Sequence, residues 1–327
     1  MRAMVCVAAF ASGIVVGAIG LGLVSPGRTA TGLTPRPTPP ATATTAQRSA
    51  PSDGLRIIGF GAHPDDCEIR AGGCAALWSQ HGYAVKFVSA TNGDIGHWQQ
   101  AGGPLAQRRK QEVLKADRML GAATEVFDIH DGELEPTLEN RRRFVRAIRR
   151  WQADVVMGHR PNDYHPDHRY VGVLMQDSAF MVAVPFFCPD VPHLRKNPVY
   201  LYYYDRFKRP TPFRPDIVVP IDEVVQKKVD ALLVMESQFI EGGALGYLRP
   251  LAPGRAAREA RRRQVREGFL RRFAAIADEF RARLIELYGE EVGRRVKYAE
   301  AFEICEYGRQ PSPEELRRIF PFAPWKE

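Results

Sequence analysis

Two short segments of the chain concentrate side chains that can bind a cation or move a proton. The segment "GFGAHPDDCE" (59–68) follows an apolar run and carries His63, Asp65, Asp66 and Glu68. Much later in the chain, "HRPNDYHPDHR" (159–169) carries His159, Asp163, His165, Asp167 and His168. A His-Pro-Asp segment by itself is typical of a turn, in which Pro fixes φ and Asp caps the next helix. Two such segments, each at the end of an apolar run, favour a functional site instead.

The residue types point to a divalent metal. Such an ion binds imidazole nitrogen and carboxylate oxygen, and a catalytic site keeps one position open for water. His63, Asp66 and His168 offer two imidazoles and one carboxylate. Asp65 then remains free to act as a base. Asp167 follows His165 by two residues, so its carboxylate is expected to hold the His165 ring and to favour the imidazolium.

The elements that must position these residues alternate between strand and helix. Apolar runs predict strands at 55–62, 84–90, 125–129 and 153–159. Helical spacing of apolar residues predicts helices at 66–81, 105–121, 138–151 and 168–182. Further strands are expected at 197–207 and 215–221, a helix at 222–235 capped by Asp222, and a long basic helix at 255–288. The order predicts an α/β fold, a Rossmann-like three-layer α/β/α domain with a mainly parallel sheet.

This fold would bring the two segments together. Right-handed crossovers place the loops that follow parallel strands along one edge of the sheet, where ligands bind in open α/β sheets. We therefore expect loops 62–66, 91–104, 130–136 and 159–167 to face one crevice. The aromatic run Tyr202 to Tyr204 is expected in the sheet core, with a sugar platform as the alternative.

The N-terminal residues do not read as part of this domain. Residues 1–25 are almost free of charge after Arg2, as in a signal peptide or a membrane anchor. Residues 26–53 are rich in Pro, Thr and Ala and predict a disordered linker, because they cannot bury enough apolar surface to fold. The folded domain is expected at 54–327. The protein would be exported or membrane-anchored through residues 1–25, or cytoplasmic if the start codon is misassigned.

Charge and cysteine content exclude several classes of protein. The formal net charge of +8 comes mostly from two Arg-rich stretches, 141–150 and 255–273. Apolar residues recur in both at helical spacing, which predicts solvated helix faces, with contact to an anionic lipid or polymer as the alternative. No nucleic-acid recognition motif accompanies them. The 5 Cys residues form no C-x-x-C pair and are expected to be small buried side chains, not disulfides or a structural zinc site.

Some of the same residues are also found in other kinds of site. Gly59-Phe60-Gly61 resembles the start of a dinucleotide-binding loop, but Pro64 stands at the third Gly position and two carboxylates would repel a pyrophosphate. Two His and one carboxylate also describe non-haem Fe(II) oxygenases. A non-catalytic exported glycan-binding protein is a further alternative, although binding alone does not require a base such as Asp65.

The two segments resemble a known family. "AHPDDCEIRAGG" (62–73) is similar to the A-H-P-D-D-x-E-x-x-x-G-G signature of the LmbE-like, or PIG-L, deacetylases, and "HPDHR" (165–169) to their second motif. "TNGDIG" (91–96) and "YAEAFEI" (298–304) resemble two further family segments. The resemblance implies a zinc-dependent N-deacetylase that removes acetyl from an N-acetylated amino sugar or glycoconjugate.

The resemblance also implies residue roles. His63, Asp66 and His168 would bind Zn²⁺, with Fe²⁺ or another divalent ion as alternatives. Asp65 would be the general base, and His165, oriented by Asp167, the acid or oxyanion stabiliser. Some members carry a Tyr that helps to stabilise the oxyanion at the position where this chain has Asp163. This contribution is therefore not carried over to Asp163. The implied partner is an N-acetylated sugar or glycoconjugate. Attachment to a membrane would come from the N-terminal segment if that segment is an anchor, and the particular substrate and the oligomeric state stay open.

Overall fold

The computed structural model describes residues 54–246, 251 and 253–326. The predicted signal or anchor segment, 1–25, and the predicted linker, 26–53, lie outside the described residues. None of the described helices combines the length and the apolar character that crossing a bilayer requires. All the described residues belong to one compact unit of the chain, which contains the predicted domain.

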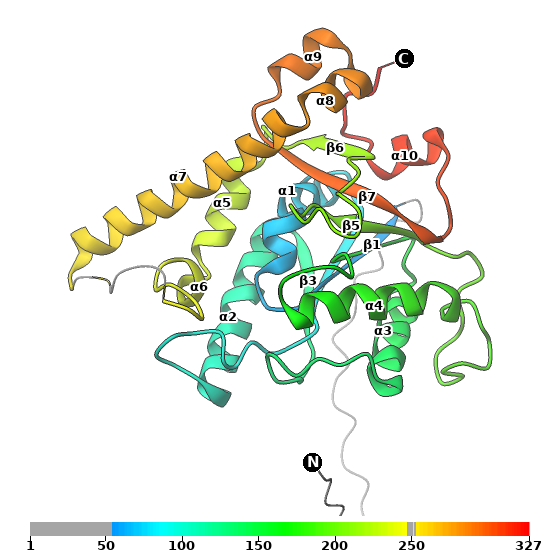
Figure 1. Ribbon diagram of the computed structural model, residues 1–327, viewed down its shortest axis with the longest axis horizontal. Coiled ribbons are helices and arrows are strands. Elements are labelled where there is room, and N and C mark those ends of the chain that lie inside the picture. The colour runs from blue at the N-terminus through cyan, green and yellow to red at the C-terminus, as the bar shows by residue number, and fades with distance from the viewer. Residues whose placement is uncertain (1–53, 247–250, 252, 327) are drawn as a thin grey trace, which may run out of the picture. The chain divides into compact units, whose positions relative to one another are not determined.

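One seven-stranded, mostly parallel sheet forms the centre of the described part of the chain (Figure 1). The strand order is β3-β2-β1-β4-β5-β7-β6, and only β7 runs antiparallel to its two neighbours among these strands. The strands are β1 (Arg56–Gly61), β2 (Ala84–Ser89), β3 (Ala122–Val126), β4 (Val155–Gly158), β5 (Val199–Tyr203), β6 (Ile217–Pro220) and β7 (Ala299–Gly308). The predicted α/β class with a mainly parallel sheet is confirmed.

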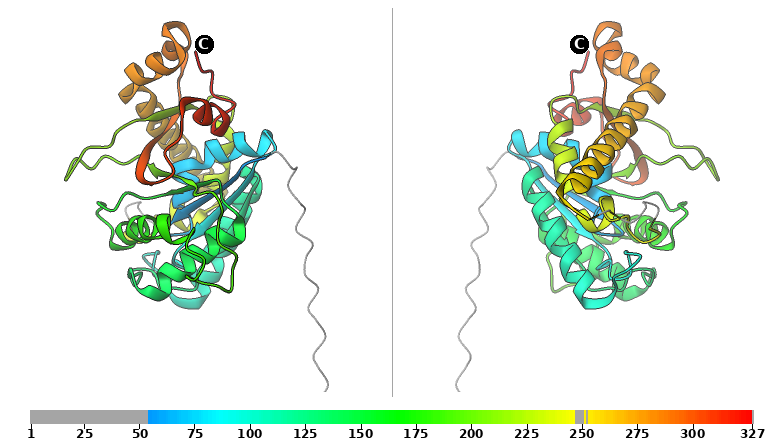
Figure 2. Two further views of the ribbon diagram at one scale, coloured as in Figure 1. Left: turned by 90° about the vertical axis from the view of Figure 1, so that its right-hand side faces the viewer. Right: turned by 90° about the vertical axis from the view of Figure 1, so that its left-hand side faces the viewer.

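Helices cover both faces of the sheet and make a three-layer arrangement. Apolar residues of α1 (Asp66–Gln80), α2 (Gly102–Leu120), α5 (Val225–Leu233) and α7 (Arg255–Glu279) belong to one core cluster. Those of α3 (Leu138–Trp151) and α4 (Pro166–Met181) belong to a second cluster on the other face. The right-hand view of Figure 2 has α7 in front of the sheet. The shorter helices are α6 (Glu236–Phe239), α8 (Arg281–Tyr288), α9 (Glu290–Arg295) and α10 (Pro313–Ile319).

The strand order explains why the two His- and Asp-rich segments meet. β1 pairs in parallel with both β2 and β4, so the loops that follow β1 and β4 lie side by side at the carboxyl edge of the sheet. The helix after β1 packs on one face of the sheet and the helix after β4 on the other. Chains that leave in opposite directions open a crevice at such a switch point.

Several predicted boundaries were wrong in detail. β3 ends at Val126, earlier than expected, because α2 ends at Gly121 with a left-handed φ of 80° and the strand follows at once. Asp222 does not cap α5, which begins at Val225; its carboxylate accepts the backbone N–H groups of Lys297 and Tyr298 instead. The predicted helix 255–288 is interrupted at Phe280 and forms α7 and α8.

The expectations for the core residues are confirmed. Cys67, Cys74, Cys188 and Cys305 are free and buried, whereas Cys6 lies outside the described residues. The run Tyr202 to Tyr204 is buried in the sheet core. One residue of the first Arg-rich stretch departs from the predicted solvated face: Arg149 is fully buried and donates to backbone carbonyls of the segment after α4, including those of Val182 and Cys188.

A buried ion pair joins α1, α5 and β7. Lys228 Nζ donates to Glu300 Oε1 at 2.6 Å and to the carbonyl of Ile69 at 2.8 Å, and both charged side chains are at most 1% exposed. The Glu300 carboxylate also accepts the backbone N–H groups of Gly73 and Cys74 in α1. Since a charge buried without its partner is costly, the two side chains must be kept or lost together.

Replacing Lys228 by Met is therefore expected to lower the free energy of unfolding by about 3–5 kcal/mol, because Glu300 is left buried without a cation. Adding Glu300→Gln should recover part of that loss, since the neutral amide still accepts a backbone N–H. Urea unfolding measures both, and Lys227→Met, at the exposed neighbouring position, serves as the control. Equal destabilisation by Lys227→Met and Lys228→Met would contradict the assignment.

Candidate active site

The four loops at the carboxyl edge enclose one pocket, as the sequence predicted. It has a volume of about 340 Å³. Loop 62–66 contributes His63, Asp65 and Asp66, loop 91–104 contributes Ile95 and Gly96, loop 130–136 contributes Asp131, and loop 159–167 contributes Tyr164 and His165. The remaining lining residues are Ile69, Arg70, Arg109, His168, Gln238, Ala244 and Arg272.

The Asp66 carboxylate lies at the centre of the site. Asp66 is the first residue of α1, and its carboxylate folds back over the preceding turn. There Oδ2 accepts the backbone N–H groups of Ala62 at 3.0 Å and His63 at 2.9 Å. The same oxygen lies 3.4 Å from His63 Nδ1 and 3.4 Å from His168 Nε2. Burial by itself would raise the pKa of Asp66, but the charge of His168 and hydrogen bonds to His159 and His168 outweigh it and hold that pKa well below its usual range.

His63 has a carboxylate on each side of its ring. Nδ1 faces Asp66, whereas Nε2 lies 3.0 Å from Asp131 Oδ1 and 3.2 Å from Asp167 Oδ2. Burial would lower the pKa of His63, but hydrogen bonds to Asp131 and Asp167 raise it well above the ordinary value. The carboxylates at Nε2 favour a proton there, which leaves Nδ1 free to bind a cation next to Asp66.

His168 is held in the same way from the other side. The first turn of α4 begins with Pro166, and His168 Nε2 faces Asp66 while Nδ1 lies 3.1 Å from Asp163 Oδ1. Burial would lower the pKa of His168, but Asp66 and Asp163 raise it to about 9. Asp163 stands where some proteins of the family that the sequence resembles carry a Tyr, and here it orients the His168 ring.

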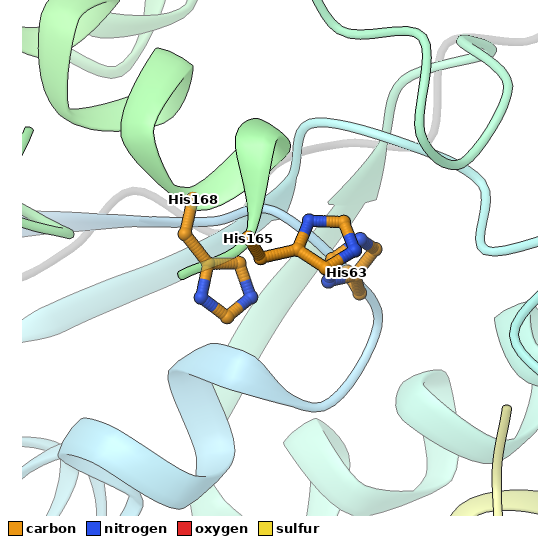
Figure 3. A group of neighbouring side chains, drawn as sticks. All are labelled: His63, His165 and His168. Carbon is orange, nitrogen blue, oxygen red and sulfur yellow. The ribbon is translucent and has the colours of Figure 1, made fainter. Parts of the chain in front are cut away.

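This donor set fits a divalent metal. Bonds of about 2.0–2.1 Å in a tetrahedral arrangement place neighbouring ligand atoms about 3.4 Å apart, which is the spacing of the Asp66 oxygen from both imidazole nitrogens. The outer nitrogen of each imidazole faces a carboxylate, as is usual for metal-binding His. Figure 3 shows His63, His165 and His168 gathered where α4 begins, and one nitrogen of each lies within 4.8 Å of the others.

His159 is a buried member of the site to which the sequence analysis assigned no role. Its Nε2 lies 3.4 Å from Asp66 Oδ2, and its ring stacks on that of His168 at 4.2 Å. Burial and the neighbouring His168 lower the pKa of His159 to about 4, so the ring is neutral. The described residues contain three groups whose donor atoms lie within 4.8 Å of one another: Asp66, His159 and His168; His63, His165 and His168; and His63, Asp131, His165 and Asp167. The trio His63, Asp66 and His168 is joined through the two 3.4 Å contacts of Asp66 and is not itself one of these groups. The position of His159 directly after the strand 155–158 was the available signal.

Arg109 and Asp131 are further pocket residues that the sequence did not single out. Arg109 lies on α2, is buried, and donates to the carbonyl of Gly93 at 3.0 Å. A side chain at Gly93, where φ is +69°, or at Gly96 would collide with the Arg109 guanidinium, which gives "TNGDIG" its physical meaning. Arg109 also lies 3.6 Å from Asp131 and 3.5 Å from Asp65. No local pattern separates Arg109 from the many other arginines of the chain.

Asp65 is placed as a base requires. It lies in the pocket lining next to Asp66 but points to Arg109 instead of His63 and His168. Burial raises the pKa of Asp65, and the charge of Arg109 opposes this rise. A carboxylate with a raised pKa at the pocket wall accepts a proton more readily than one in water.

The expected contact between the carboxylate of Asp167 and His165 is corrected. The Asp167 oxygens accept the N–H groups of Gly132 and Leu134 and face His63, whereas the backbone N–H of Asp167 donates to His165 Nδ1 at 3.2 Å. Since Nδ1 is an acceptor, the neutral ring carries its proton on Nε2. Burial and the charges of His63 and His168 lower the pKa of His165, so the neutral form is favoured over the expected imidazolium.

Residues 58–179 match the family described as PIG-L: GlcNAc-PI de-N-acetylase. Over these residues the chain is similar to the PIG-L, or LmbE-like, family. The matched residues run from β1 to α4 and include both segments with the His and Asp cluster. The later pocket residues Gln238, Ala244 and Arg272 lie beyond the match.

Two curated relatives have different activities in their names. The diacetylchitobiose deacetylase of Thermococcus kodakarensis is 28% identical over 200 residues, which cover 58% of this chain and 72% of the relative. The 4-oxalmesaconate hydratase of Pseudomonas putida is 27% identical over 201 residues, 59% of this chain and 78% of the relative. The relatives of this chain therefore include both a deacetylase and a hydratase.

Solved structures agree on the fold. The N,N'-diacetylchitobiose deacetylase of Pyrococcus horikoshii superposes with a TM-score of 0.60 at 22% identity and covers 80% of this chain and 87% of its own. The 4-carboxy-2-hydroxymuconate hydratase GalB from Pseudomonas putida gives a TM-score of 0.62 at 21% identity, with 79% and 99% covered. At these identities the likeness shows a common α/β architecture.

The ligand assignment predicts the metal content of variants. His63→Ala and His168→Ala should each lose bound zinc, because each removes one of the imidazoles that face Asp66. Elemental analysis of protein dialysed against zinc measures the stoichiometry. His193→Ala, at an exposed position outside the pocket, is the control and should keep its zinc.

His159→Ala discriminates between the proposed ligands, His63, Asp66 and His168, and the alternative set in which His159 replaces His63. We expect this variant to retain zinc, since His63 and His168 remain. Zinc lost in His159→Ala but retained in His63→Ala would move the ligand set to Asp66, His159 and His168.

Proposed function

We propose that this protein is a metal-dependent hydrolase that removes the acetyl group from an N-acetylated amino sugar or glycoconjugate. The observation that carries the proposal is the position of Asp66 between His63 and His168, with Asp65 at the wall of the same pocket. The similarity to the PIG-L family and the deacetylase among the relatives of this chain support the reaction type. Zn²⁺ is the metal proposed, because two imidazoles and one carboxylate are a ligand set that zinc enzymes use.

The residues divide the reaction among them. When bound, the ion that His63, Asp66 and His168 would hold would lower the pKa of a water and polarise the acyl carbonyl. Asp65 accepts the proton of that water as it attacks the amide carbon, and then returns the proton to the leaving amine. His165, whose Nδ1 is occupied by the Asp167 N–H, donates from Nε2 to the developing oxyanion. This role differs from the imidazolium expected from the sequence, because the lowered pKa of His165 favours the neutral ring, which still carries a proton on Nε2 to donate.

Asp131, Asp167 and Asp163 support these groups. Asp131 and Asp167 keep a proton on His63 Nε2, and Asp163 does the same at His168 Nδ1. Arg109 faces the pocket as a donor and Asp131 as an acceptor, which together suit a pair of sugar hydroxyl groups. An amino sugar presents such hydroxyls next to its acetamido group.

A hydratase is the second candidate, because one relative carries that activity in its name. Addition of water to a carbon–carbon double bond also needs a carboxylate that takes a proton from water, so Asp65 and the proposed ion would serve there as well. The two reactions differ in their product: only the hydrolase releases acetate. The curated relatives described above are enzymes by name, and none supports the non-catalytic glycan-binding alternative.

An acetate-release assay on N-acetylglucosamine and diacetylchitobiose tests the proposal. We expect release that stops when a chelator removes the metal and returns when zinc is added. If neither sugar nor a wider panel of N-acetylated glycans releases acetate with zinc present, the hydrolase assignment is wrong. Loss of absorbance from an unsaturated dicarboxylic acid under the same conditions would support the hydratase.

Asp65→Asn should keep its metal and lose at least about 10²-fold in kcat, because the amide cannot accept the proton. Metal analysis and acetate release on the same sample measure the two properties. Asp128→Asn, on an exposed residue after β3, is the control and should retain activity. Full turnover by Asp65→Asn would remove Asp65 as the base.

A further inference from the structure

A second cleft opens beside the proposed active site and is lined by arginine from three parts of the chain. It has a volume of about 510 Å³. Arg70 comes from α1, Arg206 follows β5, and Arg271 and Arg272 come from α7. We call these four residues the cationic cleft. Arg70 and Arg272 line both this cleft and the metal pocket, so the two spaces adjoin each other.

The positive charge of the cationic cleft is not balanced by the protein. Within the described residues, no hydrogen bond or ion pair reaches Arg272, and Arg70 donates only to the backbone carbonyl of Tyr204. Arg206 contacts the Tyr204 hydroxyl at 3.4 Å, and Arg271 has a loose pair at 3.7 Å with the exposed Glu267. These four side chains therefore keep most of their donors free.

The acidic groups nearby are already engaged. Asp205 is the one carboxylate among the residues described as lining the cleft, and it binds Arg160 at 2.9 Å and the N–H of Phe207. Glu279, close to the cleft, accepts the hydroxyl of Tyr204. Neither is available to offset the four guanidinium groups. Desolvation by the surrounding protein and repulsion from Arg70 and Arg206 lower the pKa of Arg272 to about 10, although the residue as a whole stays exposed to solvent.

The cleft differs from the rest of the basic helix. Earlier in α7, Arg258 and Arg262 pair with Glu236, and Arg266 pairs with Asp230. The sequence thus supplies a carboxylate for those arginines, and the solvated, paired face predicted for the helix is found there. Of the two α7 arginines that line the cleft, Arg272 has no such partner among the described residues, and Arg271 has only the loose pair with Glu267.

Gly268 adds a separate observation. It lies inside α7 at the wall of the cleft, one turn before Arg272, and a Cβ built there would meet nothing within 4 Å. Glycine inside a helix costs about 1 kcal/mol relative to Ala, and here no steric contact of the protein requires it. The absence of a side chain at Gly268 widens the cleft that the four arginines line.

We propose that the cationic cleft binds an oxyanion, a phosphate or a carboxylate, carried by the amino-sugar substrate whose acetyl group lies in the metal pocket. Guanidinium groups bind such oxyanions through paired N–H donors, and several of them around one space suit a group with more than one charge. A neutral sugar would leave the mutual repulsion uncompensated. The proposal rests on the proposed deacetylase function and names the class of substrate that the site prefers.

Three probes test this specificity: N-acetylglucosamine, its 1-phosphate, and N-acetylmuramic acid, which carries a carboxylate. We expect kcat/KM for acetate release to be at least 10-fold higher for one or both charged sugars than for N-acetylglucosamine. Preference for the 1-phosphate or for N-acetylmuramic acid identifies the oxyanion. Equal kcat/KM for all three sugars would overturn the proposal and leave the deacetylase function standing.

Variants place the preference in the cleft. Arg206→Gln with Arg271→Gln should reduce the preference for the charged sugar to less than 3-fold, because both side chains line the cationic cleft but not the metal pocket. Arg263→Gln, an exposed arginine of the same helix outside the cleft, is the control and should keep the preference. An unchanged preference in the double variant would refute the assignment. If the double variant unfolds at a lower temperature than the control, the single variants take its place.

A binding arm separates the two hypotheses. Equilibrium binding of the same three sugars to Asp65→Asn requires no turnover. Tighter binding of a charged sugar that is lost in the double variant, together with no acetate release from any sugar by the unmodified protein, would refute the deacetylase and retain the oxyanion site. Binding of all three sugars with equal affinity would refute the oxyanion site whatever the activity.

Discussion

The site depends on one buried carboxylate. Asp66 accepts two backbone N–H groups of the turn that precedes α1 and at the same time faces imidazole nitrogens of His63, His159 and His168. A carboxylate buried without such partners would protonate or destabilise the fold. The turn after β1, the end of β4 and the first turn of α4 must therefore all come to this one oxygen, which places the crevice between β1 and β4.

Around Asp66 the remaining charges form successive pairs. Asp131 and Asp167 face His63, Asp163 faces His168, and Arg109 lies between Asp65 and Asp131. The loop 91–96 contacts Arg109 closely because two glycines leave room for the guanidinium. These contacts orient the rings before any ligand arrives, so little reorganisation is required of the protein during a reaction.

The two halves of the chain contribute differently. The segment that matches the PIG-L family, 58–179, supplies the proposed ligands and base, whereas Gln238, Ala244 and Arg272 enter the pocket from later elements. The relatives of this chain include a deacetylase and a hydratase. Substrate preference is thus expected to follow the later walls, and in this chain those walls bring Arg272 of α7 to the opening.

The α/β class, the buried strands and the four loops at one edge could be read from the sequence, because apolar periodicity and short crossovers are local properties. The paired His-Asp motifs likewise marked the cluster. The direction of β7, the cap that Asp222 does not make and the break at Phe280 could not be read, because each depends on contacts with distant residues.

The same division holds at the site. The sequence by itself determined which donor atoms reach the carboxyl edge, since His63, Asp65, Asp66, His165 and His168 follow directly from strand ends. Only the tertiary structure decided which carboxylate holds which ring, that Asp167 belongs to His63, that His159 contacts Asp66, and that Arg109 lines the pocket. Pairings of this kind depend on distances between loops that no spacing along the chain encodes.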